Sequence, residues 1–155
     1  MNFKGVKLLV VAALLVLFVT GCSFGKTETL TCTNTQNVSG IKIDSNAKIS
    51  FKGNVVSDLV LTMDISATSD LMKQRWSIVE ETYNKQYAAV EKDGVKVTTK
   101  SDASNYKYTI TIQADPTKAK KEDLDKYGMG SLAGAKDTID NTKKDLEAAG
   151  FVCEK

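Results

Sequence analysis

The chain of 155 residues contains three cysteines, and their positions point to specific chemistry. Cys22 ends a long apolar run near the amino terminus, whereas Cys32 and Cys153 lie in the more polar remainder of the chain. A cysteine thiol can accept an acyl chain, form a disulfide or act as a nucleophile. The surroundings of each cysteine therefore decide which of these roles to expect.

Residues 1–21 have the composition of an export signal. Lys4 and Lys7 form a positive segment, and the apolar run over residues 8–19 is shorter than the ~20 residues of a membrane-spanning helix. The run closes with the tetrad VTGC, which ends at Gly21 and Cys22. This tetrad resembles the lipobox of bacterial lipoproteins.

The lipobox resemblance implies that the thiol of Cys22 takes a diacylglycerol and that the chain is cleaved between Gly21 and Cys22. Each buried methylene contributes about 0.8 kcal/mol, so two or three acyl chains would hold the domain at a bilayer surface. An ordinary cleaved signal and an uncleaved anchor are the alternatives. We therefore expect a signal peptide over residues 1–21 and a short tether over residues 22–28.

Cys32 and Cys153 form an even pair in a chain that we expect to be exported, where oxidation is permitted. We predict a disulfide between them. It would close a loop of about 120 residues, worth up to about 4 to 5 kcal/mol in the chain-entropy model. Two free thiols are the alternative. A redox role is disfavoured, because neither cysteine lies in a C-x-x-C motif.

The sequence contains no histidine, which removes the commonest general base and transition-metal ligand. The glycine-rich stretch GMGSLAG at residues 128–134 lacks the glycine spacing of a dinucleotide fingerprint and is interpreted as a helix connection. The acids near residues 122–125 and 137–140 lack the ligand spacing of a calcium loop. We predict no catalytic residue, no metal site and no cofactor.

The charge of the mature chain argues against nucleic acid as a partner. Removal of residues 1–21 takes away Lys4 and Lys7, so that the 19 acidic side chains are matched by an equal number of basic ones. Binding to phosphates requires a clustered excess of Lys and Arg. A neutral domain lacks that excess.

Alternating apolar and polar residues predict two β-hairpins. The first covers residues 41–65, with a tight turn at Gly53 and Asn54, and is preceded by a short strand, TETLTCT. The second joins VKVTTK to YKYTITIQAD, where the alternation places Tyr106 and Tyr108 on the buried side.

Helical periodicity begins after Ser69 and predicts one long amphipathic helix that ends at Asp93 and Gly94. Its apolar stripe is expected to be core rather than a ligand groove and consists of Met72, Trp76, Val79, Tyr83, Tyr87 and Val90. A short helix ending at Gly128 and a terminal helix with Gly150 at its C′ position follow.

The element order is β-β-β-α-β-β-α-α. Hairpins rather than alternating β-α units predict an α+β domain over residues 29–155, with an antiparallel sheet of about five strands and helices on one face.

With these elements assembled, the chain resembles the YehR-like bacterial lipoproteins, a family of small envelope proteins without assigned function. The resemblance rests on the lipobox, on LTCT at residues 30–33, on the hairpins around the Trp76 helix and on the tail KKDLEAAGFVCEK. It implies an extracytoplasmic α+β domain anchored to a bacterial membrane. Ser23 stands where an Asp would resemble an inner-membrane retention signal, which favours the outer membrane if the host has one. It supplies no active-site residues, and the two cysteines are not general in such proteins.

Three functions remain open from the sequence. The first is a non-enzymatic binding or interaction module, anchored to the membrane through a lipid on Cys22, with an envelope protein as its partner. The second is a carrier that holds a small apolar ligand between sheet and helix. The third, an enzyme or thiol-redox protein, is disfavoured by the missing residue types.

Overall fold

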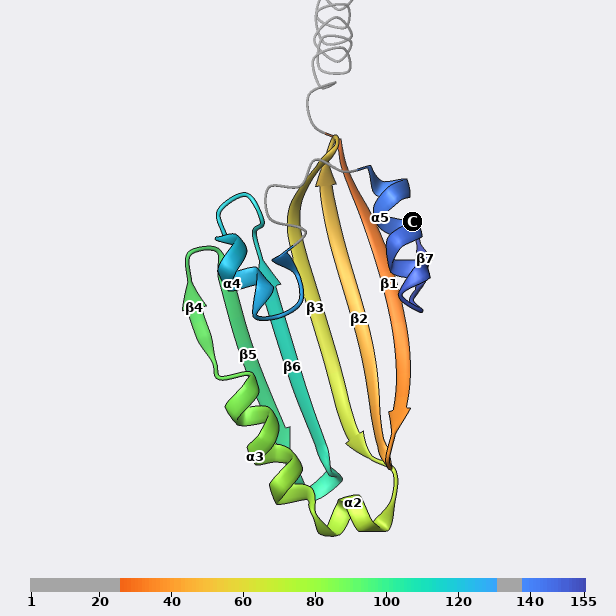
Figure 1. The fold of residues 1–155 in the computed structure, drawn as a ribbon, viewed down its shortest axis with the longest axis vertical. Coiled ribbons are helices and arrows are strands. Elements are labelled where there is room, and N and C mark those ends of the chain that lie inside the picture. Colours follow the sequence, from red (N-terminus) through yellow and green to blue (C-terminus); the bar gives the residue numbers. More distant parts are fainter. Residues whose placement is uncertain (1–25, 131–137) are drawn as a thin grey trace, which may run out of the picture.

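The computed structural model describes residues 26–130 and 138–155, and they form an α+β domain built on one antiparallel sheet. The strand order is β4-β5-β6-β3-β2-β1-β7 (Figure 1). The strands are β1 (Thr27–Val38), β2 (Ile41–Lys52), β3 (Val55–Ala67), β4 (Val90–Lys92), β5 (Val95–Asp102), β6 (Lys107–Ala114) and β7 (Val152–Glu154). The helices are α2 (Asp70–Gln74), α3 (Trp76–Gln86), the 3₁₀ turn η1 (Ala103–Asn105), α4 (Lys121–Asp125) and α5 (Ile139–Ala148).

The hairpin of β2 and β3 forms where the alternation predicts it. The strands pair from Lys52 opposite Val55 to Ile41 opposite Ala67, and Gly53 in the turn has a φ of 60°. The first strand is longer than the expected seven residues, because β1 pairs with β2 along twelve positions. The polar stretch NTQNV of β1 carries no apolar alternation, and its pairing is set by its neighbour.

The sheet has seven strands rather than about five, because two three-residue edge strands were not predicted. One of them, β4, pairs with β5 across a two-residue turn at Asp93 and Gly94, which have φ values of 43° and 82°. An Asp-Gly pair between strands favours this kind of turn. The prediction that Asp93 and Gly94 end a helix is therefore wrong.

The predicted long helix is also wrong, because it is two helices that meet at Arg75. Helix α2 begins at the N-cap Ser69, whose hydroxyl accepts a hydrogen bond from the Met72 amide at 3.3 Å. Figure 1 shows α2 at the end of the sheet and α3 running alongside β5. A straight helix cannot follow both directions, and α3 ends at Gln86, before Val90 enters β4.

The second hairpin, β5 with β6, follows the prediction except at Tyr106. Val95, Val97 and Tyr108 are buried, whereas Tyr106 is 37% exposed and has a φ of 50°. Residue 106 closes the η1 turn before β6 begins, so it lies outside the alternation of the strand. Its ring instead meets the Trp76 ring edge-on, with the ring centres 6.4 Å apart.

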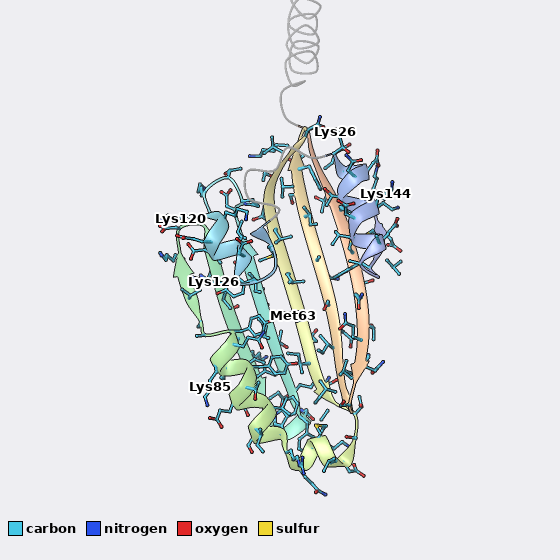
Figure 2. All side chains as sticks on the ribbon, viewed as in Figure 1. Lys26, Met63, Lys85, Lys120, Lys126 and Lys144 are labelled. Atoms are coloured by element: carbon cyan, nitrogen blue, oxygen red, sulfur yellow. A yellow bond between two sulfur atoms is a disulfide. The ribbon has the colours of Figure 1, made fainter. Side chains whose placement is uncertain are left out.

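The core lies on one face of the sheet, and α3, α4 and α5 pack side chains against it. Trp76 and Leu124 are buried there, while Ile139 and Leu146 of α5 contact the same cluster. Figure 2 shows the side chains of α3 and α4 gathered over β5 and β6. The terminal helix ends as predicted, with Gly150 following the C-cap at a φ of 89°. None of the helices in residues 26–130 and 138–155 is long and apolar enough to cross a membrane.

Candidate functional site

The residues predicted to carry chemistry fall into two groups. Gly21 and Cys22, the predicted cleavage and lipidation residues, lie outside the described residues. Cys32 and Cys153 are described, and their sulfurs are at bonding distance, 2.01 Å. The antiparallel register of β1 and β7 places these two residues directly opposite each other. Both are buried, so the disulfide belongs to the core and ties the last strand to the first.

The face of the sheet opposite the core, which we call the open face, carries the polar residues of the alternating strands. Thr35, Asp44, Asp64, Thr109 and Lys100 form one row across β1, β2, β3, β6 and β5. All five side chains are exposed or half-buried.

A groove of about 450 Å³ lies on the open face, and we call it the open-face groove. Its charged lining consists of Lys42, Asp44, Asp64, Lys100, Asp102 and Lys107. Three positive and three negative side chains leave the groove formally neutral. A partner with mixed charges therefore fits it better than one with a single sign of charge.

Asp44 and Asp64 are fixed by partners on the open face. The Thr35 hydroxyl donates to Asp44 at 2.7 Å, and the Thr109 hydroxyl donates to Asp64 at 2.6 Å. The Lys42 ammonium lies 2.7 Å from Asp44. The hydrogen bonds from Lys42 and Thr35 lower the pKa of the Asp44 carboxyl below its usual value. Asp44 is therefore ionised at neutral pH.

Four tyrosines stack in a row on the covered face of the sheet. Tyr83 lies between Tyr108 and Tyr87, with ring centres 6.2 and 6.3 Å away, and Tyr87 stacks on Tyr127 at 6.3 Å. Tyr83 and Tyr87 pack against the core, as expected for the helix stripe, but are only half-buried. Burial raises the pKa of both phenols, and a neighbouring tyrosine adds a smaller increase to each.

A second hollow of about 210 Å³ lies at the end of this row, and we call it the α4 pocket. Its lining comes from the end of α3, from β4 and β5, and from α4 with the residues that follow it. Val90, Val95 and the Tyr127 ring give it an apolar wall, and Lys92 and Lys126 lie beside them. The carboxylate of Asp123 completes the lining.

Asp123 is the most unusual residue of the α4 pocket, because it is a carboxylate with only 8% of its surface exposed. Its Oδ1 accepts a hydrogen bond from Lys126 at 2.9 Å, which lowers the pKa of the carboxyl. Among the described residues, its buried Oδ2 has no hydrogen-bond partner. An unsatisfied buried acceptor costs about 1 to 3 kcal/mol.

The glycine-rich stretch and the acidic clusters are described only in part. No three metal-ligating side chains gather in residues 26–130 and 138–155. Gly128 follows α4 and has a φ of 72°, as its predicted place at a helix end requires, whereas residues 131–134 lie outside the described residues.

Sequence reasoning found the disulfide partners but neither hollow. Alternation places Asp44 and Asp64 on the polar face, and only the register of β2 and β3 brings them together. The α4 pocket depends on β4, which was not predicted. The Asp-Gly turn was the available signal for β4, and it was interpreted as the end of a helix.

Comparison with known proteins supports the fold. No protein-family model matches the chain, and no curated protein matches it. The NMR structure of a protein from Streptococcus pneumoniae TIGR4 is 18% identical with a TM-score of 0.55, covering 83% of this chain and 86% of that chain. The NMR structure of Escherichia coli YehR is 19% identical with a TM-score of 0.53, covering 84% of this chain and 93% of that chain. At these identities the likeness concerns the fold, and the chain has a YehR-like fold.

Proposed function

We propose that this protein is a lipid-anchored, non-enzymatic binding module of the bacterial envelope, and that it docks an envelope protein on its open face. The observation that carries the proposal is the open-face groove, about 450 Å³ in volume and lined by charges of both signs. Docking requires no catalytic group, which fits a chain without histidine.

The position of the groove supports this proposal. Lys26 precedes β1 at one end of the sheet, and Thr35 lies eight positions along the strand from Thr27, roughly 26 Å away. Only four residues separate Cys22 from Thr27, so a lipid on Cys22 would hold the Lys26 end within roughly 20 Å of the bilayer. The groove then lies on the part of the domain that extends away from the membrane.

The charges of the groove favour a protein partner over a lipid or a polyanion. Lys107 is paired in register with Asp102, and Lys42 with Asp44 forms an ion pair, so positive and negative groups alternate within the groove. A surface of one sign would be attracted by half of these groups and repelled by the other half. A protein surface whose charges alternate in the complementary order would be attracted by the positive and the negative groups alike, and this would make its binding specific.

Site-specific photocrosslinking in the host tests the proposal. A photoreactive residue replaces Lys107 in the groove or, as the control, Lys144 on the exposed side of α5. We expect a discrete crosslinked partner from position 107 only. Asp64→Lys should abolish that crosslink, whereas Asp58→Lys, an exposed aspartate on the same strand outside the groove, should preserve it.

Two results would contradict the proposal. One is equal capture from positions 107 and 144, and the other is capture that Asp64→Lys leaves unchanged.

The anchor is tested separately with Cys22→Ala, which should lose incorporated fatty acid and leave the membrane fraction. Retention of that variant in the membrane would exclude a lipid on Cys22 as the anchor.

The other two functions expected from the sequence stay predictions. Carriage of a small apolar ligand would need space between α3 and the sheet, where Trp76, Val79 and Tyr83 pack against the core. A bound mass in the native mass spectrum of protein purified from the host would favour it. An enzymatic or redox role would need an activity that disappears when Cys32 and Cys153 are replaced.

A further inference from the structure

The α4 pocket lies apart from the open-face groove and has a different character. Val95 contributes to it from the covered side of the sheet, and Asp123 of α4 lines it together with Val90 and Lys92 of β4. Val90, Val95 and the Tyr127 ring give the pocket an apolar wall. Small-molecule sites combine such an apolar wall with a few placed polar groups.

The carboxylate of Asp123 in this pocket has a hydrogen-bond acceptor without a donor among the described residues. Its Oδ2 is buried and has no donor in the described part of the chain, while Oδ1 is already occupied by Lys126. An ionised carboxylate accepts hydrogen bonds and donates none. A group that binds beside Asp123 must therefore bring a donor, which means a hydroxyl, an amide or an ammonium.

The charges around Asp123 select among these donors. The charged residues of the lining are Lys92, Lys126 and Asp123, which give the pocket a formal charge of +1, and Lys120 also acts on the Asp123 carboxylate. Figure 2 shows Lys120 and Lys126 on the same side of the molecule, around α4. A further ammonium would be repelled by them, whereas a neutral hydroxyl would not. The excess positive charge also favours an acidic group elsewhere on the same ligand.

Lys92 is placed to receive that acidic group. Its side chain is exposed at the pocket, and none of the ion pairs in the described residues uses it. The Tyr127 ring offers an apolar surface and is held in place by stacking on Tyr87. A ring with hydroxyls on its edge and C–H groups on its face matches this lining.

We infer that the α4 pocket binds a small anion that carries hydroxyl groups, such as an acidic sugar, with a ligand hydroxyl donating to the Asp123 carboxylate. The acid group of the ligand pairs with Lys92, and its C–H face lies against Tyr127. This binding site is independent of the proposed docking function of the open face.

The test is an NMR titration of the ¹⁵N-labelled full chain in detergent with D-glucuronate, with D-glucose as the uncharged comparison. We expect glucuronate to shift the amide signals of Val90, Lys92 and Tyr127, and glucose to bind at least about threefold more weakly. Glycerol 3-phosphate, which combines hydroxyls with a phosphate, should shift the same signals.

Substitutions separate the roles of the two polar residues. Asp123→Asn keeps an acceptor for Lys126 and turns its amide toward the ligand, so the affinity for glucuronate should fall about tenfold or more. Lys92→Gln should remove the preference for glucuronate over glucose. The matched controls are Asp125→Asn on α4, whose ion pair with Lys121 resembles that of Asp123, and Lys85→Gln on α3.

Either of two outcomes overturns the inference. If neither glucuronate nor glycerol 3-phosphate shifts the pocket signals, the pocket does not take this class of ligand. If Asp123→Asn and Asp125→Asn bind glucuronate equally while both spectra stay well dispersed, the Asp123 carboxylate receives no ligand hydroxyl.

Discussion

Asp44 and Asp64 lie directly opposite each other on the open face, paired in register across β2 and β3. Each accepts a threonine hydroxyl, from Thr35 and Thr109 respectively. Like charges opposite each other in an antiparallel pair oppose folding. We therefore expect this pair of carboxylates to cost the fold some stability.

Replacing one of these carboxylates should stabilise the protein. Asp64→Asn removes the repulsion and keeps an oxygen that can accept from Thr109, so the free energy of unfolding should rise by about 0.2 to 1 kcal/mol in a urea titration. The same variant should weaken capture of the groove partner. Asp58→Asn on the same strand provides the control and should leave the stability nearly unchanged. A less stable Asp64→Asn protein would show that repulsion between the two aspartates is unimportant.

Removal of the disulfide should lower the stability strongly. The bridge closes a loop with a sequence separation of 121, so replacing both Cys32 and Cys153 with Ala should cost up to about 4 to 5 kcal/mol of unfolding free energy. Chemical denaturation of the double variant beside Cys22→Ala, which leaves this bridge intact, measures the difference. Lost binding with unchanged stability would instead indicate that the cysteines have a functional role.

The stacked tyrosines should make the protein sensitive to high pH. Burial raises the pKa of Tyr83 and Tyr87 in the folded state, so the unfolded chain releases these protons first as the pH rises. Stability should be complete below pH about 10, the pKa of a free tyrosine, and should fall as the pH rises through the folded values.

Thermal unfolding at increasing pH measures this effect. The fall should become shallower in Tyr83→Phe and Tyr87→Phe, whereas Tyr106→Phe, outside the stack, should follow the unchanged protein. Identical pH profiles for all of these proteins would contradict a role for the stack.

Two turn glycines should respond differently to the same substitution. Gly40 and Gly53 both have positive φ values, 84° and 60°, so alanine at either position costs about 1 to 2 kcal/mol in conformational strain. A Cβ at Gly40 would also lie 2.3 Å from Oγ of Ser69, the N-cap of α2, whereas a Cβ at Gly53 meets no atom within 4 Å.

Gly40→Ala should therefore lose more unfolding free energy than Gly53→Ala, and it should perturb α2. Urea titration gives the first comparison, and amide exchange across Asp70–Gln74 gives the second. Equal losses would mean that Ser69 moves aside without affecting the helix.

The parts of the fold that could be predicted are those where the residue pattern is compatible with only one local structure. Strict alternation in β2 and β3 leaves a single way to bury Ile49 and Leu59, and both are buried in the structure. The terminal Gly150 likewise depends on local geometry that glycine favours.

The predictions of secondary structure and burial fail where a neighbouring element determines the conformation. Val90 fits both a helix stripe and a strand, and it becomes a strand because the Asp93–Gly94 turn brings it against Val97. The strand β7 has three residues and gains its place from β1. Tyr106 fits the alternation of β6, but the η1 turn before that strand removes it from the buried side.

Neither candidate site could be derived from the sequence, for the same reason. The open-face groove requires the registers of four neighbouring strands, and the α4 pocket requires α4 to lie against β4 and β5. The residue types were visible, but Asp123 stood among several acids that a helix start would also contain.

The pairing of β1 with β2 also determines how the domain would bear force. The chain enters β1 at Thr27, and β1 pairs with β2 along its whole length to Val38. A pull on this end, resisted by a partner held on the open-face groove, would act along the strands and strain their hydrogen bonds together rather than one after another. If the proposed anchor and partner exist, this geometry would let the domain keep its shape under a pull between them.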